Sequence, residues 1–297
     1  MTRGDVGTNA AHKSLRELID DRRLLVAPGV YDGLTAALAQ SAGFDAAYMS
    51  GAAVAASAVG LPDIGLATLT EMMAQATVIK RQLDVPLIAD ADTGFGDVKN
   101  TYRTVQEYVR AGVAAIQLED QEFPKKCGHL DDKRVIETEA FAEKISAAVE
   151  ARGEGDLLVV ARTDARATHG FSAAIERAQA YVAAGADIIF VEAPQSFDEI
   201  RAIPAEVDAP VLFNLVGRGK SPAVTLSDLE AFGYALAVVP GACLSPVVSS
   251  VAAALHSLRH GDPEPATQLA PRELFDTLGL PFWESLHETH EKEVSGV

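Results

Sequence analysis

The chain contains few of the residues that stabilise secreted proteins or bind nucleic acid. Only two of its 297 residues are cysteines, Cys127 and Cys243, so we expect no disulfide framework and a reducing, cytoplasmic environment. Lysine and arginine total 25 against 42 acidic residues, which gives a formal net charge of −17. Nucleic-acid binding depends on clustered cations that neutralise phosphates, so this balance argues against such a partner. An anionic ligand would need a locally basic pocket.

Long apolar runs are also missing. No stretch of about 18 consecutive apolar residues occurs, as a membrane-spanning helix would need. The opening "MTRGDVGTNAAHKSLRELIDDRR" lacks the apolar segment of a signal peptide. Hydrophobic residues nevertheless make up 48% of the chain, enough for a large core. We therefore expect a soluble, cytoplasmic protein with no membrane partner.

A repeating unit runs along the chain. Four times, a predicted helix ends at a glycine and an apolar run follows within a few residues, at Gly43, Gly112, Gly185 and Gly233. Glycine favours the left-handed backbone with which many helices end. The apolar runs are nearly uninterrupted, which is typical of strands buried on both faces of a parallel sheet.

Four further apolar runs complete the pattern, at Leu24–Ala27, Pro86–Ala89, Leu157–Ala161 and Pro210–Phe213. Eight strands alternating with helices predict a closed (β/α)₈ barrel of the TIM type over residues 1–260. An open doubly wound sheet is the alternative, although no GxGxxG follows the first strand. We expect residues 261–297, which carry the only tryptophan, Trp283, to form a C-terminal helical extension.

Carboxylates follow two neighbouring predicted strands. Asp90 and Asp92 are two residues apart, so on a strand they point to the same side, and Glu119 ends the next strand. Three carboxylates at one edge would repel unless a cation joined them. Oxygen ligands without histidine favour Mg²⁺ or Mn²⁺. The alternative is that the two aspartates cap the next helix or bind water.

The stretch "LEDQEFPKKCGH" concentrates charge and a thiol in one loop. Cys127 and His129 do not indicate zinc, because no second Cys/His pair has suitable spacing. We expect nearby cations to lower the pKa of the Cys127 thiol and to ease proton exchange. Burial of Cys127 as a small apolar residue is the alternative. Lys125 and Lys126 either form an ordinary solvated pair or belong to the site. The sequence favours membership of the site more strongly for Lys126 than for Lys125.

These motifs resemble the isocitrate lyase and phosphoenolpyruvate mutase superfamily over residues 14–260. The stretches that carry the resemblance are "YMSGAAVAASAVGLPDIG", "ADADTGFGD", "LEDQEFPKKCGH", "ARTDAR", "FVEAP" and "NLV". The "KKCGH" motif is similar to that of the lyase branch, which includes methylisocitrate lyases, dimethylmalate lyases and oxaloacetate hydrolases.

The resemblance implies a barrel that is commonly a homotetramer, with its last helix exchanged between subunits. It implies Mg²⁺ (or Mn²⁺) bound directly by Asp92, largely through water by Asp90 and Glu119, and with Asp63 nearby. It further implies a set of residues that bind the substrate, some at the carboxylate of a 2-oxo acid and others in a polar wall or a closing loop: Ser50, Gly51, Ala52, Gly128, Arg162, Glu192 and Asn214.

Two departures from methylisocitrate lyases bear on the substrate. Those enzymes carry an arginine shortly after the eighth strand, where this chain has Ser245, and a histidine where this chain has Gln117. Both departures favour a dicarboxylate smaller than a tricarboxylic acid.

The expected reaction is cleavage of the C2–C3 bond of a 2-hydroxy dicarboxylate, such as 2,3-dimethylmalate or 2-methylisocitrate, to pyruvate and a carboxylic acid. Cys127 would donate a proton as general acid and Tyr48 would act as base. The candidate catalytic residues are Cys127, Tyr48, Lys126, His129, Arg162 and Glu192. Oxaloacetate hydrolysis, phosphorus–carbon chemistry of the phosphonomutase type and a catalytically silent binding barrel remain alternatives.

Overall fold

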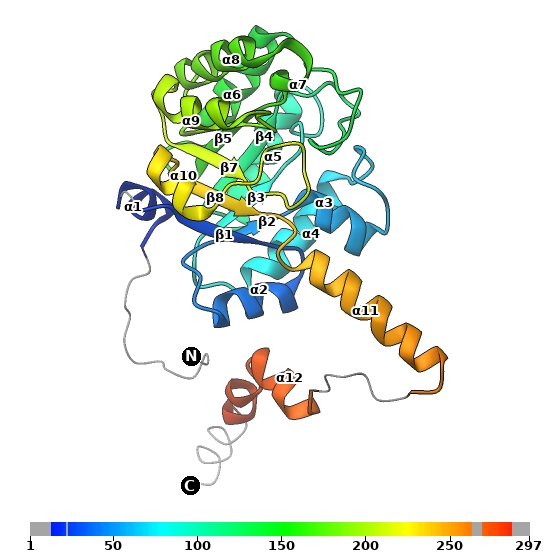
Figure 1. Ribbon diagram of the computed structural model, residues 1–297. Coiled ribbons are helices and arrows are strands. Elements are labelled where there is room, and N and C mark those ends of the chain that lie inside the picture. Colours follow the sequence, from blue (N-terminus) through cyan, green and yellow to red (C-terminus); the bar gives the residue numbers. More distant parts are fainter. Residues whose placement is uncertain (1–12, 22, 263–268, 287–297) are drawn as a thin grey trace, which may run out of the picture.

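Eight parallel strands close into a barrel in the computed structural model, which describes residues 13–21, 23–262 and 269–286 (Figure 1). The strands follow one another around the barrel in chain order, and β8 pairs with β1 to close it. They are β1 (Leu25–Val30), β2 (Ala47–Met49), β3 (Leu87–Asp90), β4 (Ala115–Glu119), β5 (Leu158–Thr163), β6 (Ile188–Val191), β7 (Val211–Asn214) and β8 (Leu236–Val239). The predicted barrel is confirmed, and the open sheet is excluded.

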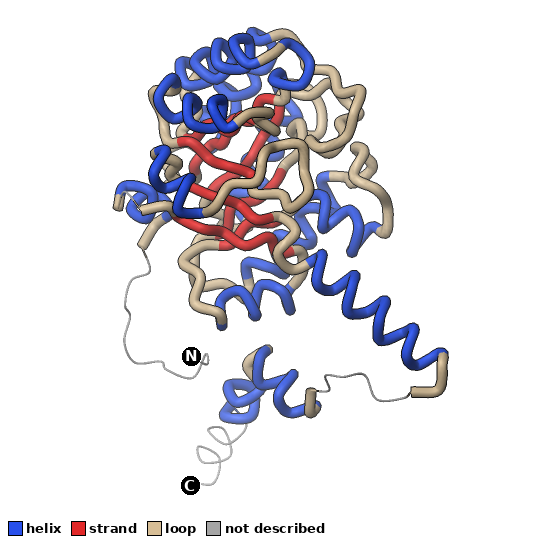
Figure 2. Tube along the Cα trace, viewed as in Figure 1, coloured by secondary structure: helices blue, strands red, loops and turns tan. Residues whose placement is uncertain are grey.

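Helices surround the strands (Figure 2). They are α1 (Leu15–Asp20), α2 (Gly33–Ser41), α3 (Gly51–Val54), the π-helix η1 (Ala55–Val59), α4 (Leu69–Lys80), α5 (Val98–Arg110), α6 (Thr138–Arg152), α7 (Ala165–His169), α8 (Phe171–Ala183), α9 (Phe197–Glu206), α10 (Leu226–Phe232), α11 (Leu244–Arg259) and α12 (Pro271–Thr277). The four glycines predicted after helices all have a positive φ, between 73° and 101°. Each therefore ends a helix in the conformation that glycine tolerates best.

Two apolar clusters hold the barrel together. The larger lies between the strands and the outer helices, and the smaller fills the barrel with side chains such as Ile88, Phe190 and Leu236. Leu15 and Ile19 of α1 belong to this inner cluster. The helix α1 therefore packs against the interior from one end, while the carboxyl ends of the strands remain available for polar residues.

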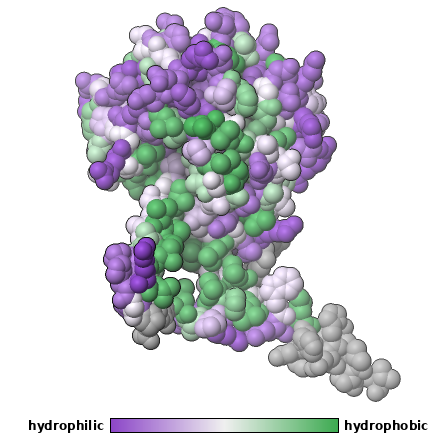
Figure 3. Space-filling view, turned by 90° about the vertical axis from the view of Figure 1, so that its right-hand side faces the viewer, coloured by the Kyte–Doolittle hydropathy of each residue, from purple (hydrophilic) through white to green (hydrophobic). Residues whose placement is uncertain are grey.

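The C-terminal segment leaves the barrel. The helix α11 extends away from it, and α12 lies beneath α2 (Figure 1). No side chain of α11 is buried, and Val248, Leu255 and Leu258 are each about 60% exposed. Figure 3 shows apolar surface along this segment. The expected extension over residues 261–297 is helical at α12 and at 280–286, while 263–268 and 287–297 lie outside the described residues.

Within the described ranges, none of the helices combines the length and the apolar composition that crossing a membrane would require.

Candidate active site

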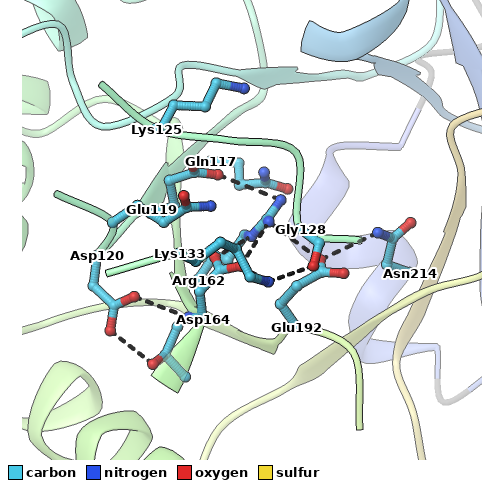
Figure 4. A network of polar contacts seen from close by, with 12 residues as sticks. Gln117, Glu119, Asp120, Lys125, Gly128, Lys133, Arg162, Asp164, Glu192 and Asn214 are labelled. Atoms are coloured by element: carbon cyan, nitrogen blue, oxygen red, sulfur yellow. Dashed lines mark hydrogen bonds and ion pairs between the residues drawn. The ribbon is translucent and has the colours of Figure 1, made fainter. Parts of the chain in front are cut away.

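The carboxyl ends of the strands bring charged residues to one rim of the barrel (Figure 4). Asp90 ends β3, Glu119 ends β4, Arg162 lies one residue before the end of β5, and Glu192 directly follows β6. All four side chains are buried, with relative exposures between 1% and 7%. Charged groups are rarely buried unless they are paired or functional. The predicted convergence of these strand ends is therefore present.

Asp90 organises the first part of this rim. Its Oδ2 accepts a hydrogen bond from the backbone N–H of Gly51 at 3.2 Å and from the hydroxyl of Tyr48 at 3.4 Å. A Cβ at position 51 would lie 2.5 Å from the same oxygen, so only glycine allows this approach. The close contact joins the ends of β2 and β3.

Asp92 follows in a left-handed backbone conformation, with φ of 49°. In this conformation its N–H donates to Asp90 Oδ1 at 3.1 Å, and its carbonyl accepts from the N–H of Glu119 at 2.9 Å. Non-glycine residues adopt this conformation at a cost of about 1–2 kcal/mol. The surrounding hydrogen bonds stabilise it and join the backbone of Asp92 to Asp90 and Glu119 at the ends of the neighbouring strands β3 and β4.

Lys125 is a buried cation among these carboxylates. Its Nζ lies 2.5 Å from Asp63 Oδ1 and 2.7 Å from Asp92 Oδ1, and its side chain is only 4% exposed. Burial opposes the charge, but the carboxylates of Asp92 and Glu119 outweigh it and hold the pKa of Lys125 well above its usual value. Lys125 is therefore a fixed positive charge of the site.

One lysine does not satisfy all the buried carboxylate oxygens. Asp92 Oδ1 and Glu119 Oε1 have no hydrogen bond of good geometry to any described residue. Burial raises the pKa of Asp92 to about 6 and raises the pKa of Glu119 well above its usual range. Unpaired buried carboxylates are costly unless a cation or a proton joins them. These two oxygens are consistent with a divalent cation.

The arrangement suits a cation that keeps several water ligands. In the part of the chain that the structure describes, no group of three His, Cys, Asp or Glu side chains is close enough together to ligate one ion directly. Mg²⁺ commonly binds through one or two carboxylates and retains the rest of its hydration shell. The donors present therefore fit Mg²⁺ or Mn²⁺ better than a metal that needs a complete protein cage.

Arg162 lies at the centre of a second group of charges (Figure 4). Its Nε donates to Asp164 Oδ2 at 2.8 Å, and its NH1 and NH2 lie 3.4 Å and 3.5 Å from Glu119 and Glu192. Burial disfavours the charge, but Asp164 and the two glutamates outweigh it and raise the pKa of Arg162 above its usual value. This guanidinium is permanently charged and held in one plane, as carboxylate recognition requires.

Asp164 is held from two further sides. The side chain of Lys133 is only 1% exposed. Its Nζ donates to Asp164 Oδ1 at 2.8 Å and also to the carbonyl of Gly128. The backbone N–H of Asp164 donates to Asp120 Oδ1 at 2.9 Å. Arg162 and the residues around it thus form one connected network.

Asp120 closes this network on the outer side of β4. Its Oδ2 accepts hydrogen bonds from Thr163 Oγ1 at 2.7 Å, Tyr181 OH at 2.9 Å and Arg177 NH1 at 3.2 Å. The Asp120 carboxyl is buried yet fully hydrogen-bonded. Such a group supports its neighbours and leaves no oxygen for a ligand.

The loop with the "KKCGH" motif covers these charges. The N–H of Cys127 donates to the carbonyl of Asp63 at 3.0 Å. A Cβ at Gly128 would lie 2.4 Å from Arg162 NH2 and 2.5 Å from Glu192 Cδ, so glycine lets the backbone rest directly on both side chains. The thiol is therefore carried by a loop in contact with both charged groups.

The thiol itself differs from the sequence-based expectation. Cys127 is partly buried, and burial raises the pKa of its thiol above the usual 9.0, against the opposing effects of His129 and Arg162. The predicted lowering of this pKa was wrong, because desolvation outweighs the nearby cations. Cys127 is a protonated thiol at neutral pH, which suits a proton donor better than a nucleophile.

A polar wall stands opposite the carboxylates (Figure 4). Glu192 Oε2 accepts from Asn214 Nδ2 at 3.2 Å, and Glu192 Oε1 lies 3.1 Å from His129 Nε2. Burial lowers the pKa of His129, although Glu192 opposes this effect. The three predicted residues therefore meet in space, although they are far apart in the sequence.

The two adjacent lysines lie differently from what the sequence suggested. Lys126 is on the outer side of the loop, where its Nζ lies 3.4 Å from the carbonyl of Asp131. It lines a surface cavity of about 510 Å³ together with Glu122 and Arg134. Lys126 is thus not brought to the carboxylates, whereas Lys125 is.

Tyr48, Ser50 and Ala52 lie at the end of β2. Burial, reinforced by Asp90, raises the pKa of Tyr48 well above 10, so its hydroxyl stays protonated. Ser50 caps α3 by accepting from the N–H of Ala53 at 3.3 Å. Ala52 lies in the first turn of this helix. The backbone of this turn faces Asp90, while Tyr48 supplies a hydrogen-bond donor and not a ready base.

Some members of the site had no signal in the sequence. Lys133 follows the "KKCGH" motif by a few residues and carries no motif of its own, and Asp120 and Asp164 stand in the sequence only as acidic residues just after predicted strands. Strand-end position could have assigned these two acids to the rim. It could not have shown that they bind Arg162 and Arg177 respectively.

Comparison with known proteins agrees with this geometry. Residues 15–259 match the family model described as phosphoenolpyruvate phosphomutase. A 2,3-dimethylmalate lyase of Eubacterium barkeri is 42% identical over 97% of this chain and 99% of its own length. A 2-methylisocitrate lyase of Aeropyrum pernix is 52% identical over 76% of this chain and 72% of its own.

Solved structures show the same relationship. An oxaloacetate acetylhydrolase in complex with 3,3-difluorooxalacetate superposes with a TM-score of 0.91, at 36% identity over 94% of this chain and 97% of its own. A phosphonopyruvate hydrolase in complex with oxalate and Mg²⁺ has a TM-score of 0.83, at 29% identity over 92% of this chain and 96% of its own. The chain belongs to the phosphoenolpyruvate phosphomutase family, within the PEP mutase/isocitrate lyase superfamily.

Proposed function

We propose that the protein is a Mg²⁺-dependent carbon–carbon lyase that cleaves C2–C3 of a 2-hydroxy dicarboxylate to pyruvate and a carboxylic acid. The observation that carries this proposal is the buried Glu119 Oε1, which lacks a partner among the described residues, beside an Asp92 carboxylate held by Lys125 alone, beneath a loop that carries the protonated thiol of Cys127. The relatives named 2,3-dimethylmalate lyase and 2-methylisocitrate lyase support the same reaction class.

Asp92 would bind the metal directly, and Asp90 and Glu119 would do so through water. When bound, Mg²⁺ (or Mn²⁺) supplies a Lewis acid that polarises the oxygen of the substrate's 2-hydroxyl group. Lys125 bridges Asp63 and Asp92 at 2.5 and 2.7 Å, so it fixes these two carboxylates and partly neutralises them. Asp63 then serves the site mainly by holding Lys125.

The substrate's carboxylates need positive or donating partners. The backbone around Ser50, Gly51 and Ala52 would bind the carboxylate of the pyruvate half, as the family resemblance implies. Arg162 and the Asn214 amide would bind the carboxylate of the departing acid, because they are the donors on the opposite wall. Bond cleavage leaves negative charge on that acid, and Arg162 stabilises it as it develops.

The proton steps follow from the protonation states. Cys127 would donate its proton to the carbon of the departing acid, because its raised pKa keeps the thiol protonated at neutral pH. Tyr48 stays protonated too, and its hydroxyl lies 3.1 Å from Gln117 Oε1 and 3.4 Å from Asp90 Oδ2. Tyr48 would accept the proton of the substrate hydroxyl as its own hydroxyl turns from Gln117 and passes its proton to Asp90, so that it does not ionise on its own.

The wall at the end of β8 favours a small substrate. Residues 240–250, which include the first residues of α11, contain no lysine, arginine or histidine, and the family resemblance places Ser245 where methylisocitrate lyases carry an arginine. A buried carboxylate without such a partner is strongly disfavoured. We therefore favour a 2-alkylmalate such as 2,3-dimethylmalate over 2-methylisocitrate.

Oxaloacetate hydrolysis to oxalate and acetate is the second candidate. It is favoured by the superposition on oxaloacetate acetylhydrolase, which covers nearly the whole of both chains. It would use the same metal and the same carboxylate donors. Phosphorus–carbon chemistry would leave Cys127 without a role, and a silent barrel would not need the unpaired buried oxygen of Glu119.

We also propose a cytoplasmic homotetramer in which α11 and the helical extension pack on a neighbouring subunit. The apolar side chains along α11 are exposed, and soluble monomers rarely expose such a contiguous patch (Figure 3). Size-exclusion chromatography with light scattering would measure the subunit number, and a monomer would contradict this part of the proposal.

A substrate panel tests the reaction. Purified protein is incubated with 2,3-dimethylmalate, 2-methylisocitrate, 2-methylmalate or oxaloacetate, with Mg²⁺ or with EDTA. Pyruvate is detected through lactate dehydrogenase, and oxalate and acetate are measured separately. We expect Mg²⁺-dependent pyruvate, fastest from the alkylmalate. Oxalate plus acetate without pyruvate would select the hydrolase, and activity unaffected by EDTA would overturn the metal assignment.

A further inference from the structure

The loop after β7 lies against the loop that carries Cys127 and His129. The backbone N–H of Lys220 donates to His129 Nδ1 at 3.1 Å. The side chain of Lys220 reaches the carbonyl of Leu130 at 3.1 Å and Asp131 Oδ1 at 2.6 Å. Two loops that are some ninety residues apart in the sequence are thus joined at the histidine.

This hydrogen bond fixes the chemical state of the imidazole. A backbone N–H can only donate, so His129 Nδ1 must accept and carries no proton. Burial lowers the pKa of His129, which favours the neutral ring. The ring proton must then be on Nε2, the atom that faces Glu192.

The Nε2 atom lies 3.1 Å from Glu192 Oε1, but the two are not well aligned. Neither atom has a hydrogen bond to any other described residue. A small rotation of the ring or of the carboxylate joins them as donor and acceptor. Glu192 Oε2 already accepts from Asn214. The orientation of the His129 ring therefore decides whether Glu192 Oε1 also has a hydrogen-bond donor.

Gly219 leaves room for the ring. A Cβ built at this position would lie 2.7 Å from His129 Cε1 and 2.8 Å from Nδ1, closer than side chains tolerate. Two residues earlier, a Cβ at Gly217 would meet nothing within 4 Å. Arg218 between them has a positive φ of 61°, which is uncommon for a non-glycine residue and turns the backbone at this point.

We propose that Gly219 and the backbone N–H of Lys220 are positioning elements that hold His129 in its Nε2–H form against Glu192. This assignment rests on the proposed lyase function for its effect on turnover, but its structural part stands without that function. The loop after β7 bonds the His129 ring through this one backbone N–H. Any effect of the loop on turnover should therefore act through the position of the His129 ring and of the loop that carries Cys127.

Three substitutions separate the possible contributions. Gly219→Ala pushes the ring away, whereas Gly217→Ala in the same loop changes nothing near it and is the matched control. Lys220→Ala removes the side-chain contacts but keeps the backbone N–H. We expect Gly219→Ala to lower kcat about 100-fold with KM changed less than twofold, because a displacement of about 1 Å can have this effect. The other two variants should retain wild-type kcat.

Two results would overturn the proposal. Equal kcat in Gly219→Ala and Gly217→Ala would remove the role of the glycine. An equal loss in Lys220→Ala would assign the effect to the lysine side chain. Thermal unfolding of each variant checks the fold, which we expect to survive because only a side-chain ring must move.

A second measurement does not depend on turnover. Protein labelled with ¹⁵N-histidine reports the ring tautomer by NMR, and comparison with His129→Asn identifies the signal among the seven histidines. We expect the Nε2–H pattern in the wild type and its loss in Gly219→Ala. A wild-type ring protonated on Nδ1 refutes the positioning role, whichever reaction is catalysed. Correct tautomers with no product from any dicarboxylate would instead refute the lyase assignment alone.

Discussion

Two buried charged clusters lie side by side in this barrel, and they are built differently. The carboxylate cluster comprises Asp63, Asp90, Asp92, Glu119 and Lys125. The arginine network comprises Asp120, Lys133, Arg162, Asp164, Arg177 and Tyr181. In the first, Glu119 Oε1 has no partner among the described residues, and the only partner given for Asp92 Oδ1 there is the Lys125 ammonium at 2.7 Å. In the second, Asp120 and Asp164 accept hydrogen bonds on both oxygens.

The carboxylate cluster has the character of a binding site, and the arginine network has that of the structure that holds the site in place. An incompletely paired cluster costs folding free energy, which a ligand can return when it binds. A fully paired network adds rigidity, and it offers few atoms to a ligand. Neighbouring acids such as Glu119 and Asp120 therefore have opposite roles, although they are adjacent in the sequence and equally buried.

The largest expected effect is in the carboxylate cluster. Asp92→Asn should lower Mg²⁺-dependent pyruvate formation about 10⁴-fold, or about 5 kcal/mol in the activation free energy, because it removes the carboxylate that we propose as the direct metal ligand. Steady-state rates at saturating Mg²⁺ measure this. Asp97→Asn is the control, since Asp97 only caps α5 and should leave the rate unchanged. A rate above one tenth of the wild type in Asp92→Asn would reject Asp92 as the ligand.

The next effect concerns the thiol of Cys127, whose loop contacts both clusters through its backbone. Cys127→Ser should lower kcat about 10³-fold, because a serine hydroxyl is a much weaker acid than a thiol. Mg²⁺ binding, followed by calorimetry, should be unchanged. Cys243→Ser, in the other cysteine of the chain, should have wild-type activity. Unchanged turnover in Cys127→Ser would remove the proton-donor role.

The free energy of unfolding of one variant from each cluster tests the difference between the two clusters directly. Asp120→Asn should destabilise the protein by about 3 kcal/mol, because it leaves the buried charge of Arg177 without its partner. Glu119→Gln should leave the metal-free protein as stable as the wild type or more so, because it removes a buried charge with an unpaired oxygen. Urea unfolding in EDTA measures both. Similar losses in the two variants would show that the clusters are not different in kind.

The smallest effect is on pH dependence. Cys127 must be protonated to donate, and its pKa lies above the usual 9.0. The kcat of the wild type should therefore be constant through neutral pH and fall only above about pH 9 as the thiol ionises. Cys127→Ser should lack this alkaline fall in its residual activity. A fall that begins below pH 8 would indicate a lowered thiol pKa and contradict the burial argument.

The sequence predicted the fold and one half of the site well. Eight apolar runs and the glycines after the helices define the barrel, and strand-end position places Asp90, Asp92 and Glu119 together because parallel strands share one edge. Periodicity gives no information inside an irregular loop, so it could not distinguish buried Lys125 from partly exposed Lys126. It also could not reveal the burial of Cys127, because the loop is held in place by residues distant in sequence: the N–H of Cys127 bonds the carbonyl of Asp63, and Gly128 rests on Arg162.

The left-handed backbone at Asp92 affects the choice of an inactive form for crystallography with bound substrate. Asparagine tolerates positive φ better than alanine does and has the shape of aspartate. Asp92→Asn should thus keep the hydrogen bonds that join β3 to β4 while slowing catalysis, whereas alanine would add backbone strain. The asparagine form is accordingly the better one in which to trap an uncleaved dicarboxylate and identify it.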